Sequence, residues 1–481
     1  MTRPVMPNEY PAVTLNRAPE PDDDLARELR AAGVTIDTAA SARADHGRDW
    51  WPLSIAQVHA GRVPHWPGLV ARPTTSGQVA EVLRRAGARG VAVTAQGGRS
   101  GVVGGAVAPD GGVALDMTGL NRVLEIDDVS GLVRVEAGCF GPELEAATRA
   151  RGWTVGHHPQ SFELSTVGGW IACRGAGQYS NRYGKVEDIV RALSVVLASG
   201  EMIHLGGRAP RRATGPDLLQ LFVGSEGALG VITEATLVMR PAPAHEARAA
   251  YGFATFEAGL ETCRRIVQRG AAPAVLRLYD ETESRRHFQV QGCALIVLDE
   301  GDESLCDAAM SVVAVECALA TELETELVTT WIAHRNDVDA LAPLWEAGVV
   351  VDTVEVSGAW SDLAAMSQRV LTTLRALPDT RAASVHQSHA YLDGACLYFT
   401  FAGRPEGDPT GYYRSAWDAV SREVLSAGGA LSHHHGVGRN RARFMSAALG
   451  DTFALLSSLK ALLDPGNILN PGVLGLGGPS W

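Results

Sequence analysis

The spacing of apolar residues predicts an α/β arrangement in the first half of the chain. A helix capped by Thr74 is predicted from apolar positions at i, i+3, i+4 and i+7, namely Val79, Val82, Leu83 and Ala86. Short valine-rich runs predict strands at residues 91–95, 113–117, 123–126 and 132–136. Residues 143–151 predict a second helix, and Ser199-Gly200 is typical of a hairpin turn between residues 193–198 and 202–205.

This pattern changes at Pro241-Ala242-Pro243, where we expect the first domain boundary. Residues 245–425 predict an α+β region with longer helices and β runs at 294–298 and 396–401. Residues 442–463 predict one helix. Residues 464–472 are rich in Pro, Gly and Asn and should lie along another domain. At the other end, residues 1–25 are rich in Pro and Asp and should form a loosely ordered arm.

The composition is that of a globular protein with two or three domains. The chain has 481 residues, of which 46% are hydrophobic and 20% charged. Its net charge of -12 argues against nonspecific binding of nucleic acid. An anionic ligand would therefore need a locally basic pocket.

The cysteines and the terminus indicate a reducing compartment. Seven scattered cysteines without a CxxC pair argue against a disulfide scaffold and against a zinc ribbon. No run approaches the ~20 apolar residues of a membrane span. The N-terminus shows no secretion signal, so a cytoplasmic location is expected.

Three consecutive histidines, His433, His434 and His435, stand between Gly429 and Gly436. Imidazoles titrate near neutral pH and need partners for both ring nitrogens, so a buried core disfavours such a run. The flanking glycines let the backbone approach a ligand closely. The segment predicts an active-site loop for proton handling or anion binding, with a surface run or a metal tract as the alternatives.

Three glycine-bearing segments could hold a phosphate-containing ligand. They are Thr94-Ala95-Gln96-Gly97-Gly98-Arg99-Ser100-Gly101, residues 156–169 and Gly224-Ser225-Glu226-Gly227-Ala228-Leu229-Gly230-Val231-Ile232-Thr233. None matches the GxGxxG or the GxxxxGK[ST] motif, which argues against a Rossmann site and a P-loop. Each alone is also compatible with an ordinary turn, but three in this order are a strong signal.

The order GGxS, ELSTVGG, GSEGALGVITE over residues 65–242 resembles the FAD-binding domain of the vanillyl-alcohol-oxidase superfamily, the PCMH type. The second half is similar to the alkylglycerone-phosphate synthase branch, through Pro273-Ala274-Val275-Leu276-Arg277-Leu278, Asp352-Thr353-Val354-Glu355-Val356-Ser357, Ser388-His389-Ala390-Tyr391 and the histidine segment. The resemblance covers nearly the whole chain after about residue 45.

The resemblance implies an α+β fold in four parts. They are an N-terminal arm with lead-in helices (1–64), a PCMH-type FAD-binding domain of two α/β subdomains (65–242), an α+β substrate or cap domain with an antiparallel sheet (243–427), and a C-terminal segment that returns to the flavin (428–481). A homodimer would fit the family. A small-molecule substrate is expected.

The resemblance also implies the residues that hold FAD. They are Thr94, Gln96, Gly97, Gly98, Arg99, Ser100, Gln160, Ser161, Ser165, Thr166, Gly168, Gly169, Cys173, Arg174, Ala176, Glu226, Gly230, Val231 and Ile232. Relatives that attach the flavin covalently use a His in the first loop or a Cys near the second. Arg99 stands in place of that His, and the second loop has Ser and Thr but no Cys before Cys173, so noncovalent FAD is expected.

The implied catalytic set is Tyr398, Arg277 and the three histidines His433, His434 and His435. A tyrosine near a cation is a reasonable acid or base because the cation favours phenolate. The alternatives are a core aromatic for Tyr398 and an ion pair with Asp280 or Glu281 for Arg277. His157-His158 can equally be a turn before Pro159.

One departure concerns the substrate. Trp345 falls where the synthase branch has a phosphate-binding arginine, and His334 and Arg335 are the nearby groups that could compensate. An indole cannot replace a bidentate guanidinium. A substrate without phosphate, planar or apolar, is therefore expected.

Three enzymatic functions and one non-enzymatic one compete. The leading hypothesis is an FAD-dependent oxidoreductase that moves a hydride from a small organic substrate to flavin N5. The first alternative is a true alkylglycerone-phosphate synthase, and the second is a D-2-hydroxy-acid dehydrogenase, whose HxGDGNxH metal motif is absent here. No metal is therefore expected. A degenerate flavin-binding scaffold is disfavoured because the His, Tyr and Arg set is intact.

Overall fold

The computed structural model describes residues 20–59, 61–63, 65–337 and 342–478. Most of the arm predicted over residues 1–25 lies outside this part. Residue Asp23 already begins helix α1 (Asp23–Ala31), because the carboxylate of Asp22 accepts a hydrogen bond from the Leu25 amide at 2.9 Å. The arm prediction is thus wrong for its last residues.

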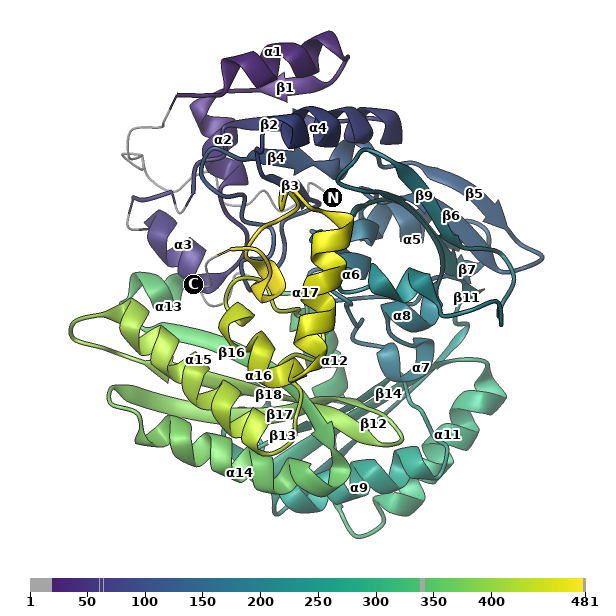
Figure 1. Cartoon of the computed structure of the whole chain (residues 1–481). Helices are drawn as coiled ribbons and strands as arrows, with labels where there is room; N and C mark the ends of the chain where they lie inside the picture. Colours follow the sequence, from purple (N-terminus) through teal and green to yellow (C-terminus); the bar gives the residue numbers. More distant parts are fainter. Residues whose placement is uncertain (1–19, 60, 64, 338–341, 479–481) are drawn as a thin grey trace.

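The upper part of the molecule contains two sheets (Figure 1). Within the described chain, the first has the order β1-β2-β4-β3, with β1 Thr35–Asp37, β2 Leu69–Arg72, β3 Val93–Gln96 and β4 Val113–Asp116. The second is antiparallel in the order β5-β6-β10-β8-β9, with β5 Val123–Asp127, β6 Leu132–Glu136, β8 Val190–Val196, β9 Met202–Gly206 and β10 Val231–Val238. A short pair joins β7 (Trp153–Thr154) to β11 (Arg240–Pro241).

Two of the helices that accompany these sheets, α4 and α5, are the ones that the sequence predicts. The helices of this part are α2 Ala40–His46, α3 Pro52–His59, α4 Ser76–Ala88, α5 Gly141–Arg149, α6 Val167–Ala172, α7 Ser180–Tyr183 and α8 Val186–Ile189. The predicted apolar face of α4 is fully buried. Its cap is Thr75 rather than Thr74, because the Thr75 hydroxyl accepts from the Gln78 amide at 3.2 Å. The hairpin of β8 and β9 is confirmed.

A large antiparallel sheet forms the lower part (Figure 1). Among the described residues its order is β15-β12-β14-β13-β17-β18-β16, with β12 His245–Phe253, β13 Val275–Tyr279, β14 Cys293–Gly301, β15 Thr321–Leu323, β16 Val350–Ala359, β17 Thr380–Ala390 and β18 Gly394–Gly403. The helices of this part are α9 Phe256–Gln268, α10 Glu281–Phe288, α11 Glu303–Glu316, α12 Glu326–His334, α13 Ala342–Glu346, α14 Trp360–Ala376 and α15 Pro409–Ser426. The predicted domain boundary falls between β11 and β12.

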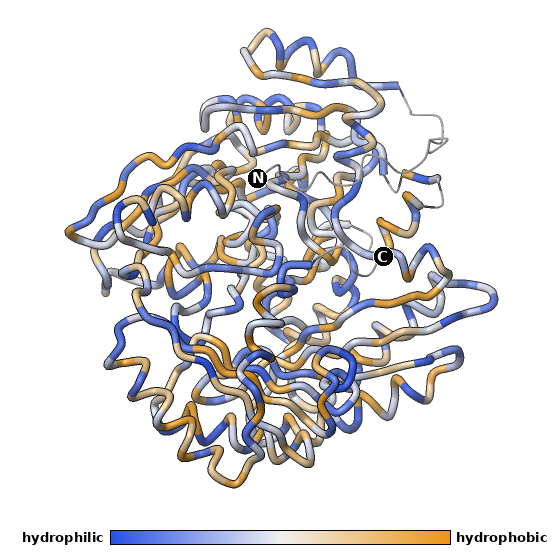
Figure 2. Tube along the Cα trace, turned by 180° about the vertical axis from the view of Figure 1, so that it is seen from behind, coloured by the Kyte–Doolittle hydropathy of each residue, from blue (hydrophilic) through white to orange (hydrophobic). Residues whose placement is uncertain are grey.

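The two faces of this sheet have different roles. Strand side chains alternate between faces, so Leu397, Phe399 and Phe401 of β18 enter the core under α9, α14 and α15. Their neighbours Tyr398 and Thr400 point to the opposite face and line the cavity between this sheet and the upper sheets. Figure 2 shows hydrophobic stretches along this lower sheet as well as in the upper part. The alternation thus separates a packing face from a cavity-lining face.

The C-terminal segment returns from the lower part of the molecule to the upper part (Figure 1). Its Asn470 side chain donates to the carbonyl oxygens of Gly105 and Glu226, each at 2.8 Å. The single helix predicted over residues 442–463 is wrong. It divides into α16 (Met445–Leu449) and α17 (Thr452–Leu463), because Gly450 adopts φ 54°, a conformation that favours glycine.

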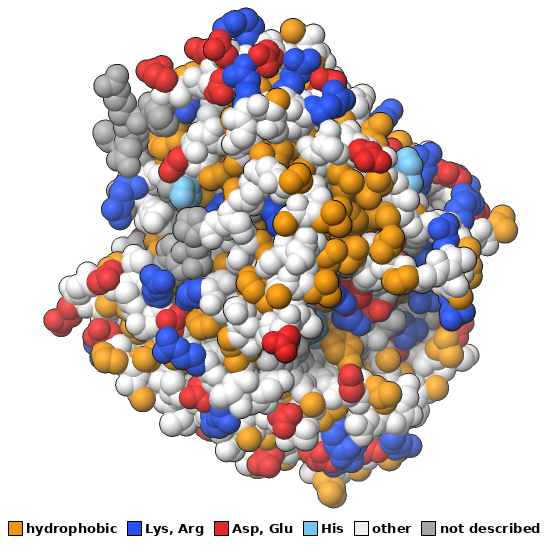
Figure 3. All heavy atoms as spheres, viewed as in Figure 1, with side chains coloured by type: hydrophobic (Ala, Val, Ile, Leu, Met, Phe, Trp, Pro, Cys, Tyr) orange, Lys and Arg blue, Asp and Glu red, His pale blue; other side chains and the backbone are white. Residues whose placement is uncertain are grey.

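One face of the molecule carries an apolar area. Figure 3 shows hydrophobic side chains gathered on the face that carries α17, where Leu455 and Leu462 are 62% and 75% exposed. Throughout the described chain, every helix is too short or too polar to cross a bilayer. The seven cysteines, all of them described, are free.

Candidate active site

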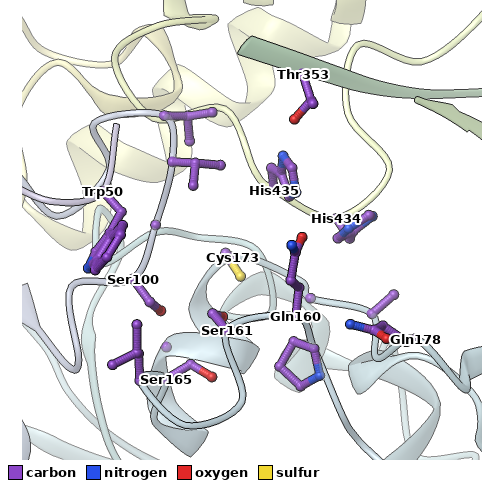
Figure 4. Close-up of a pocket in the computed structure, with 18 of the residues that line it drawn as sticks. Trp50, Ser100, Gln160, Ser161, Ser165, Cys173, Gln178, Thr353, His434 and His435 are labelled. Atoms are coloured by element: carbon purple, nitrogen blue, oxygen red, sulfur yellow. The ribbon is translucent and has the colours of Figure 1, made fainter. Parts of the chain in front are cut away.

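The three glycine-bearing segments meet at one cavity of about 820 Å³ between the upper sheets and the large sheet. The first segment begins within β3, the second runs into the start of α6, and the third runs into the start of β10. Figure 4 shows His434 and His435 of the C-terminal segment above Gln160 and Ser161. The cavity is therefore built from segments that are far apart in the sequence.

Close packing explains the glycines of the first segment. A Cβ atom on Gly98 would lie 1.6 Å from the Leu164 carbonyl oxygen, and one on Gly97 would lie 2.1 Å from Thr166 Oγ1. No side chain fits at either position without moving the second segment. The first two segments thus form a continuous wall of exposed backbone, which suits a phosphate-bearing ligand.

Every predicted cofactor residue lines this cavity except Thr94 and Arg174. Residue Thr94 is buried within β3, where its hydroxyl donates to Asn470 Oδ1 at 3.2 Å. The side chain of Arg174 faces away from the cavity and pairs with Glu187 at 3.3 Å. Neither side chain can contact a ligand there, so both assignments are corrected.

Unpaired polar atoms in the cavity wall fit a polar cofactor. Within the described part of the chain, Gln96 Oε1, Gln178 Oε1 and both ring nitrogens of His157 are buried without a hydrogen-bond partner. Burial lowers the pKa of His157 to about 3, so its ring is neutral. The ring centroids of His157 and Trp170 lie 4.7 Å apart, and His157 lines the cavity. His157 therefore does more than form a turn before Pro159. Gln178 carries no glycine or histidine signal and was not predicted.

Arg99 and Cys173 bear on how the expected FAD would be attached. Arg99, which replaces a covalent histidine, adopts φ 55° and pairs with Asp45 at 2.6 Å. Cys173 lines the cavity, and burial raises the pKa of its thiol to about 12. A protonated thiol is a poor nucleophile, which favours noncovalent binding.

Two buried carboxylates hold the histidine loop, residues 431–439. Glu355 of β16 is fully buried and accepts hydrogen bonds from the His435 amide at 2.8 Å and from Arg441 Nη1 at 2.9 Å. Burial alone would raise its pKa, but Arg441 and His435 outweigh burial and lower the pKa to about 2. Glu355 is therefore ionised and clamps the loop.

The second carboxylate belongs to Glu226 of the third segment. It accepts from the Val437 amide at 2.5 Å and from the Gly438 amide at 2.8 Å. Burial raises its pKa to about 7. Although Glu226 lines the cavity, its side chain is thus occupied by the C-terminal loop. Glu355 had no predicted role. Its only sequence signal is a charged residue inside an apolar strand.

The loop meets the predicted tyrosine. The Tyr398 hydroxyl lies 2.8 Å from His434 Nε2 and 2.9 Å from His435 Nε2. Burial raises the pKa of Tyr398 well above 10, although Arg277 acts in the opposite direction. The expectation that the cation favours phenolate is therefore corrected. Burial is the larger effect, so Tyr398 is a phenol that contacts neutral imidazoles.

Arg277 reaches the cavity from β13. Its Nη2 lies 2.9 Å from His386 Nε2, and His386 Nδ1 lies 2.7 Å from Glu283 Oε2. An arginine only donates, so His386 accepts at Nε2 and carries its proton on Nδ1. The alternative ion pair with Asp280 or Glu281 is absent among the described residues. The Nε atom of Arg277 is buried and unpaired within the same part.

The predicted substrate residues Trp345, His334 and Arg335 also line the cavity. Trp345 donates its indole N–H to the Val351 carbonyl at 3.1 Å and packs 6.1 Å from Tyr413. Arg335 stacks on Tyr179 and hydrogen-bonds to its hydroxyl, whereas His334 is exposed and pairs with Asp337 at 3.0 Å. The wall at Trp345 is therefore aromatic.

A group of four side chains is compact enough to hold an ion. The potential ligand atoms of His389, Cys396, His433 and His434 lie within 4.8 Å of one another. The ring nitrogens of His433 and His434 are already paired with each other at 2.8 Å and with tyrosine hydroxyls. Burial raises the pKa of the Cys396 thiol. These contacts fit a hydrogen-bonded cluster.

Family models cover most of the chain. Residues 67–206 match an FAD binding domain, and residues 242–474 match the C-terminal domain of FAD linked oxidases. An uncharacterized FAD-linked oxidoreductase of Escherichia coli (strain K12) is 30% identical over 85% of this chain and 89% of its own length.

Solved structures agree with these matches. An alkyldihydroxyacetonephosphate synthase superimposes with a TM-score of 0.80 and 26% identity over 95% of this chain and 87% of its own. A p-cresol methylhydroxylase gives a TM-score of 0.75 over 95% of this chain and 97% of its own at 15% identity, which confirms the PCMH-type fold. The chain therefore belongs to the FAD-linked oxidoreductase family, and FAD is its cofactor.

Proposed function

We propose that the protein oxidises a small organic substrate by transferring a hydride from a substrate carbon to flavin N5. The supporting observation is the Tyr398 hydroxyl, which lies on the cavity wall between His434 and His435. Bound FAD supplies the hydride acceptor, and the residues around it supply position and proton transfer.

Tyr398 and the histidines would take the proton that such an oxidation releases. Burial keeps Tyr398 protonated and lowers the pKa of His435 to about 4, so a neutral imidazole adjoins a phenol. The phenol can accept a proton from the substrate while it passes its own proton to the imidazole. Neither group has to carry a lasting charge in the buried site.

The substrate would bind with its polar end near Arg277 and an apolar or planar part near Trp345. Arg277 offers its unpaired Nε, and Arg286 also lines that wall. Trp345 has already used its N–H on Val351 and presents only an aromatic face. A phosphate at Trp345 would find no donor from that side chain.

Anaerobic mixing tests this proposal. The holoenzyme is mixed with primary and secondary alcohols, aromatic alcohols and 2-hydroxy acids, each with and without a phosphate group, while the flavin absorbance is followed. Bleaching by an unphosphorylated substrate is expected. Tyr398→Phe should slow bleaching by about 100-fold or more with FAD still bound, since general acid–base catalysis contributes 10²–10⁴-fold.

A matched control is Tyr412→Phe, because the Tyr412 hydroxyl bonds to Thr380 at 2.9 Å and does not line the cavity. This variant should bleach at the wild-type rate. Bleaching of Tyr398→Phe at that same rate would remove Tyr398 from the mechanism.

The alternative is an alkylglycerone-phosphate synthase, which exchanges acyl for alkyl without net oxidation. The cationic wall of Arg277, Arg286 and Arg335 favours it, because guanidinium groups bind phosphate. Alkyl exchange from acyl-dihydroxyacetone phosphate without bleaching would establish this alternative and refute the oxidoreductase proposal.

A further inference from the structure

A continuous series of hydrogen bonds joins Tyr398 to a second tyrosine. Tyr398 Oη lies 2.8 Å from His434 Nε2, and His434 Nδ1 lies 2.8 Å from His433 Nδ1. His433 Nε2 lies 2.9 Å from Tyr391 Oη. At the other end, Tyr398 Oη lies 2.9 Å from His435 Nε2. Every link has an ordinary hydrogen-bond length.

The histidines in this series are neutral. Burial lowers the pKa of His433 and of His435 to about 4, and that of His434 well below 6.5. A neutral imidazole carries one proton, so one ring nitrogen donates and the other accepts. Because His433 and His434 use both nitrogens in the series, all links must point in the same direction.

Only two arrangements satisfy every link. In the inward arrangement Tyr391 donates to His433, His433 to His434, His434 to Tyr398, and Tyr398 to His435. In the outward arrangement each of these donors is an acceptor. The arrangements differ by the shift of one proton along each link. The Glu355 carboxylate lies 3.6 Å from His435 Nδ1 and favours a proton there, which favours the inward arrangement in the free enzyme.

The series crosses the wall of the cavity. The inner members Tyr398, His434 and His435 line the cavity, whereas His433 and Tyr391 do not. Figure 4 shows His434 and His435 at the cavity itself. The outer end at Tyr391 is partly exposed, contacts Ser180 at 3.1 Å, and has Lys185 Nζ 4.8 Å from its ring. The series therefore leads from the reacting centre towards the surface beside Lys185.

We propose that His434, His433 and Tyr391 form a proton relay that connects Tyr398 with the solvent beside Lys185. The relay rests on the proposed function only in taking its proton from the substrate. In the outward arrangement the substrate proton bonds to Tyr398 Oη, and the Tyr398 proton moves to His434 Nε2. The His434 Nδ1 proton moves to His433 Nδ1, the His433 Nε2 proton moves to Tyr391, and the Tyr391 proton leaves to water.

This transfer reverses the three links between Tyr391 and Tyr398, while His435 keeps its proton on Nε2 and the Tyr398 hydroxyl carries the substrate proton. When the two-electron acceptor that reoxidises the flavin takes the Tyr398 proton, the His434 Nε2 proton moves to Tyr398 and the His433 Nδ1 proton moves to His434 Nδ1. The Tyr391 proton then moves to His433 Nε2, Tyr391 takes a proton from water, and the outward arrangement is restored without any ring rotation. Glu355 is a positioning residue in this scheme, because it holds the His433 and His435 amides and thereby the spacing of the rings.

Nitrogen-15 NMR of the histidine rings tests the relay in the free holoenzyme, without turnover. The inward arrangement predicts protons on Nδ1 of His433, on Nε2 of His434 and on Nδ1 of His435, with resonances assigned by single His→Gln variants. The outward arrangement predicts the other nitrogen in all three rings. Protons on Nε2 of both His433 and His434 would break the series and overturn the proposal.

Kinetics provide the second test. Tyr391→Phe removes the outer hydroxyl and should lower kcat about 10-fold or more, with KM within 2-fold and FAD fully bound, in line with general acid–base contributions. It should also change the solvent deuterium isotope effect on kcat, which a purely structural brace would leave unaltered. Tyr412→Phe again serves as the control and should keep the wild-type kcat.

The outcomes separate this proposal from the proposed function. If no substrate bleaches wild-type flavin, the proposed function fails while the NMR test still decides the relay. If wild type bleaches and Tyr391→Phe keeps its kcat and isotope effect, the relay alone fails. One equivalent of zinc retained after dialysis against a chelator would also overturn it, because a metal would occupy the nitrogens of His433 and His434.

Discussion

Replacing Glu355 with glutamine should loosen the histidine loop and lower the stability of the protein. Glu355 and Arg441 are both fully buried, and their 2.9 Å ion pair is reinforced by the His433 and His435 amides. Glutamine has nearly the same shape but no charge, and its NH2 group is a donor. The substitution therefore leaves the Arg441 guanidinium buried without its countercharge.

The structure sets the size of the effect. Lowering the Glu355 pKa from 4.5 to about 2 corresponds to roughly 3 kcal/mol in favour of the ionised form. Breaking a buried ion pair from one side removes about 3–5 kcal/mol, which agrees. With an unfolding entropy of about 2.1 cal/mol/K per residue, cooperative unfolding of 481 residues gives a fall in Tm of about 3 °C.

Differential scanning fluorimetry and flavin release measure this effect. Glu281→Gln is the control, because its pair with Arg285 is 61% exposed on both sides and should leave Tm unchanged. The pKa of Glu355 also determines how its stabilising effect depends on pH. A depressed carboxyl pKa stabilises above the unfolded value of 4.5, and this stabilisation is lost as the pH falls towards 2. The Tm difference should be constant from pH 5 to 8 and shrink below pH 4.5.

Two results would refute this reasoning. A Tm for Glu355→Gln within 1 °C of wild type at pH 7 would show that the carboxylate does not stabilise the loop. If the Tm difference between wild type and Glu355→Gln widened below pH 4.5, the Glu355 carboxyl would be protonated at neutral pH.

Three further predictions concern the cofactor and the second carboxylate. Gly98→Ala should weaken FAD binding by about 10-fold or more, because overpacking costs about 1–3 kcal/mol, and equilibrium dialysis against FAD measures it. Gly407→Ala, whose Cβ would meet nothing within 4 Å, should bind FAD normally. Acid precipitation should release all flavin into the supernatant, and flavin in the pellet would contradict noncovalent binding. Since burial raises the Glu226 pKa to about 7, its stabilisation is present below pH 4.5 and lost as pH rises through 7. The fall in Tm between pH 5 and pH 8 should therefore be smaller for Glu226→Gln than for wild type. If both proteins lose the same Tm over this range, another group causes the fall.

Local sequence patterns predict the parts whose physical cause is local. The apolar face of α4 and the β8–β9 hairpin each follow from neighbouring residues, because helical periodicity and a short turn are local features. The glycine segments were found because close backbone approach requires glycine. The histidine loop was found because three imidazoles among glycines are unsuited to a core.

Side-chain direction outside regular elements depends on contacts that no local pattern encodes. Thr94 and Arg174 stand in the predicted segments but turn away, because Asn470 and Glu187 bind them. The clamp at Glu355 joins residues 78 to 86 positions apart, so a charged residue inside an apolar strand could not by itself identify its partners. Burial, which only the packed molecule supplies, keeps Tyr398 protonated against the pull of Arg277. The sequence therefore identified the residue types of the site. Their protonation states and hydrogen-bond partners depend on the low-dielectric space that distant segments enclose together.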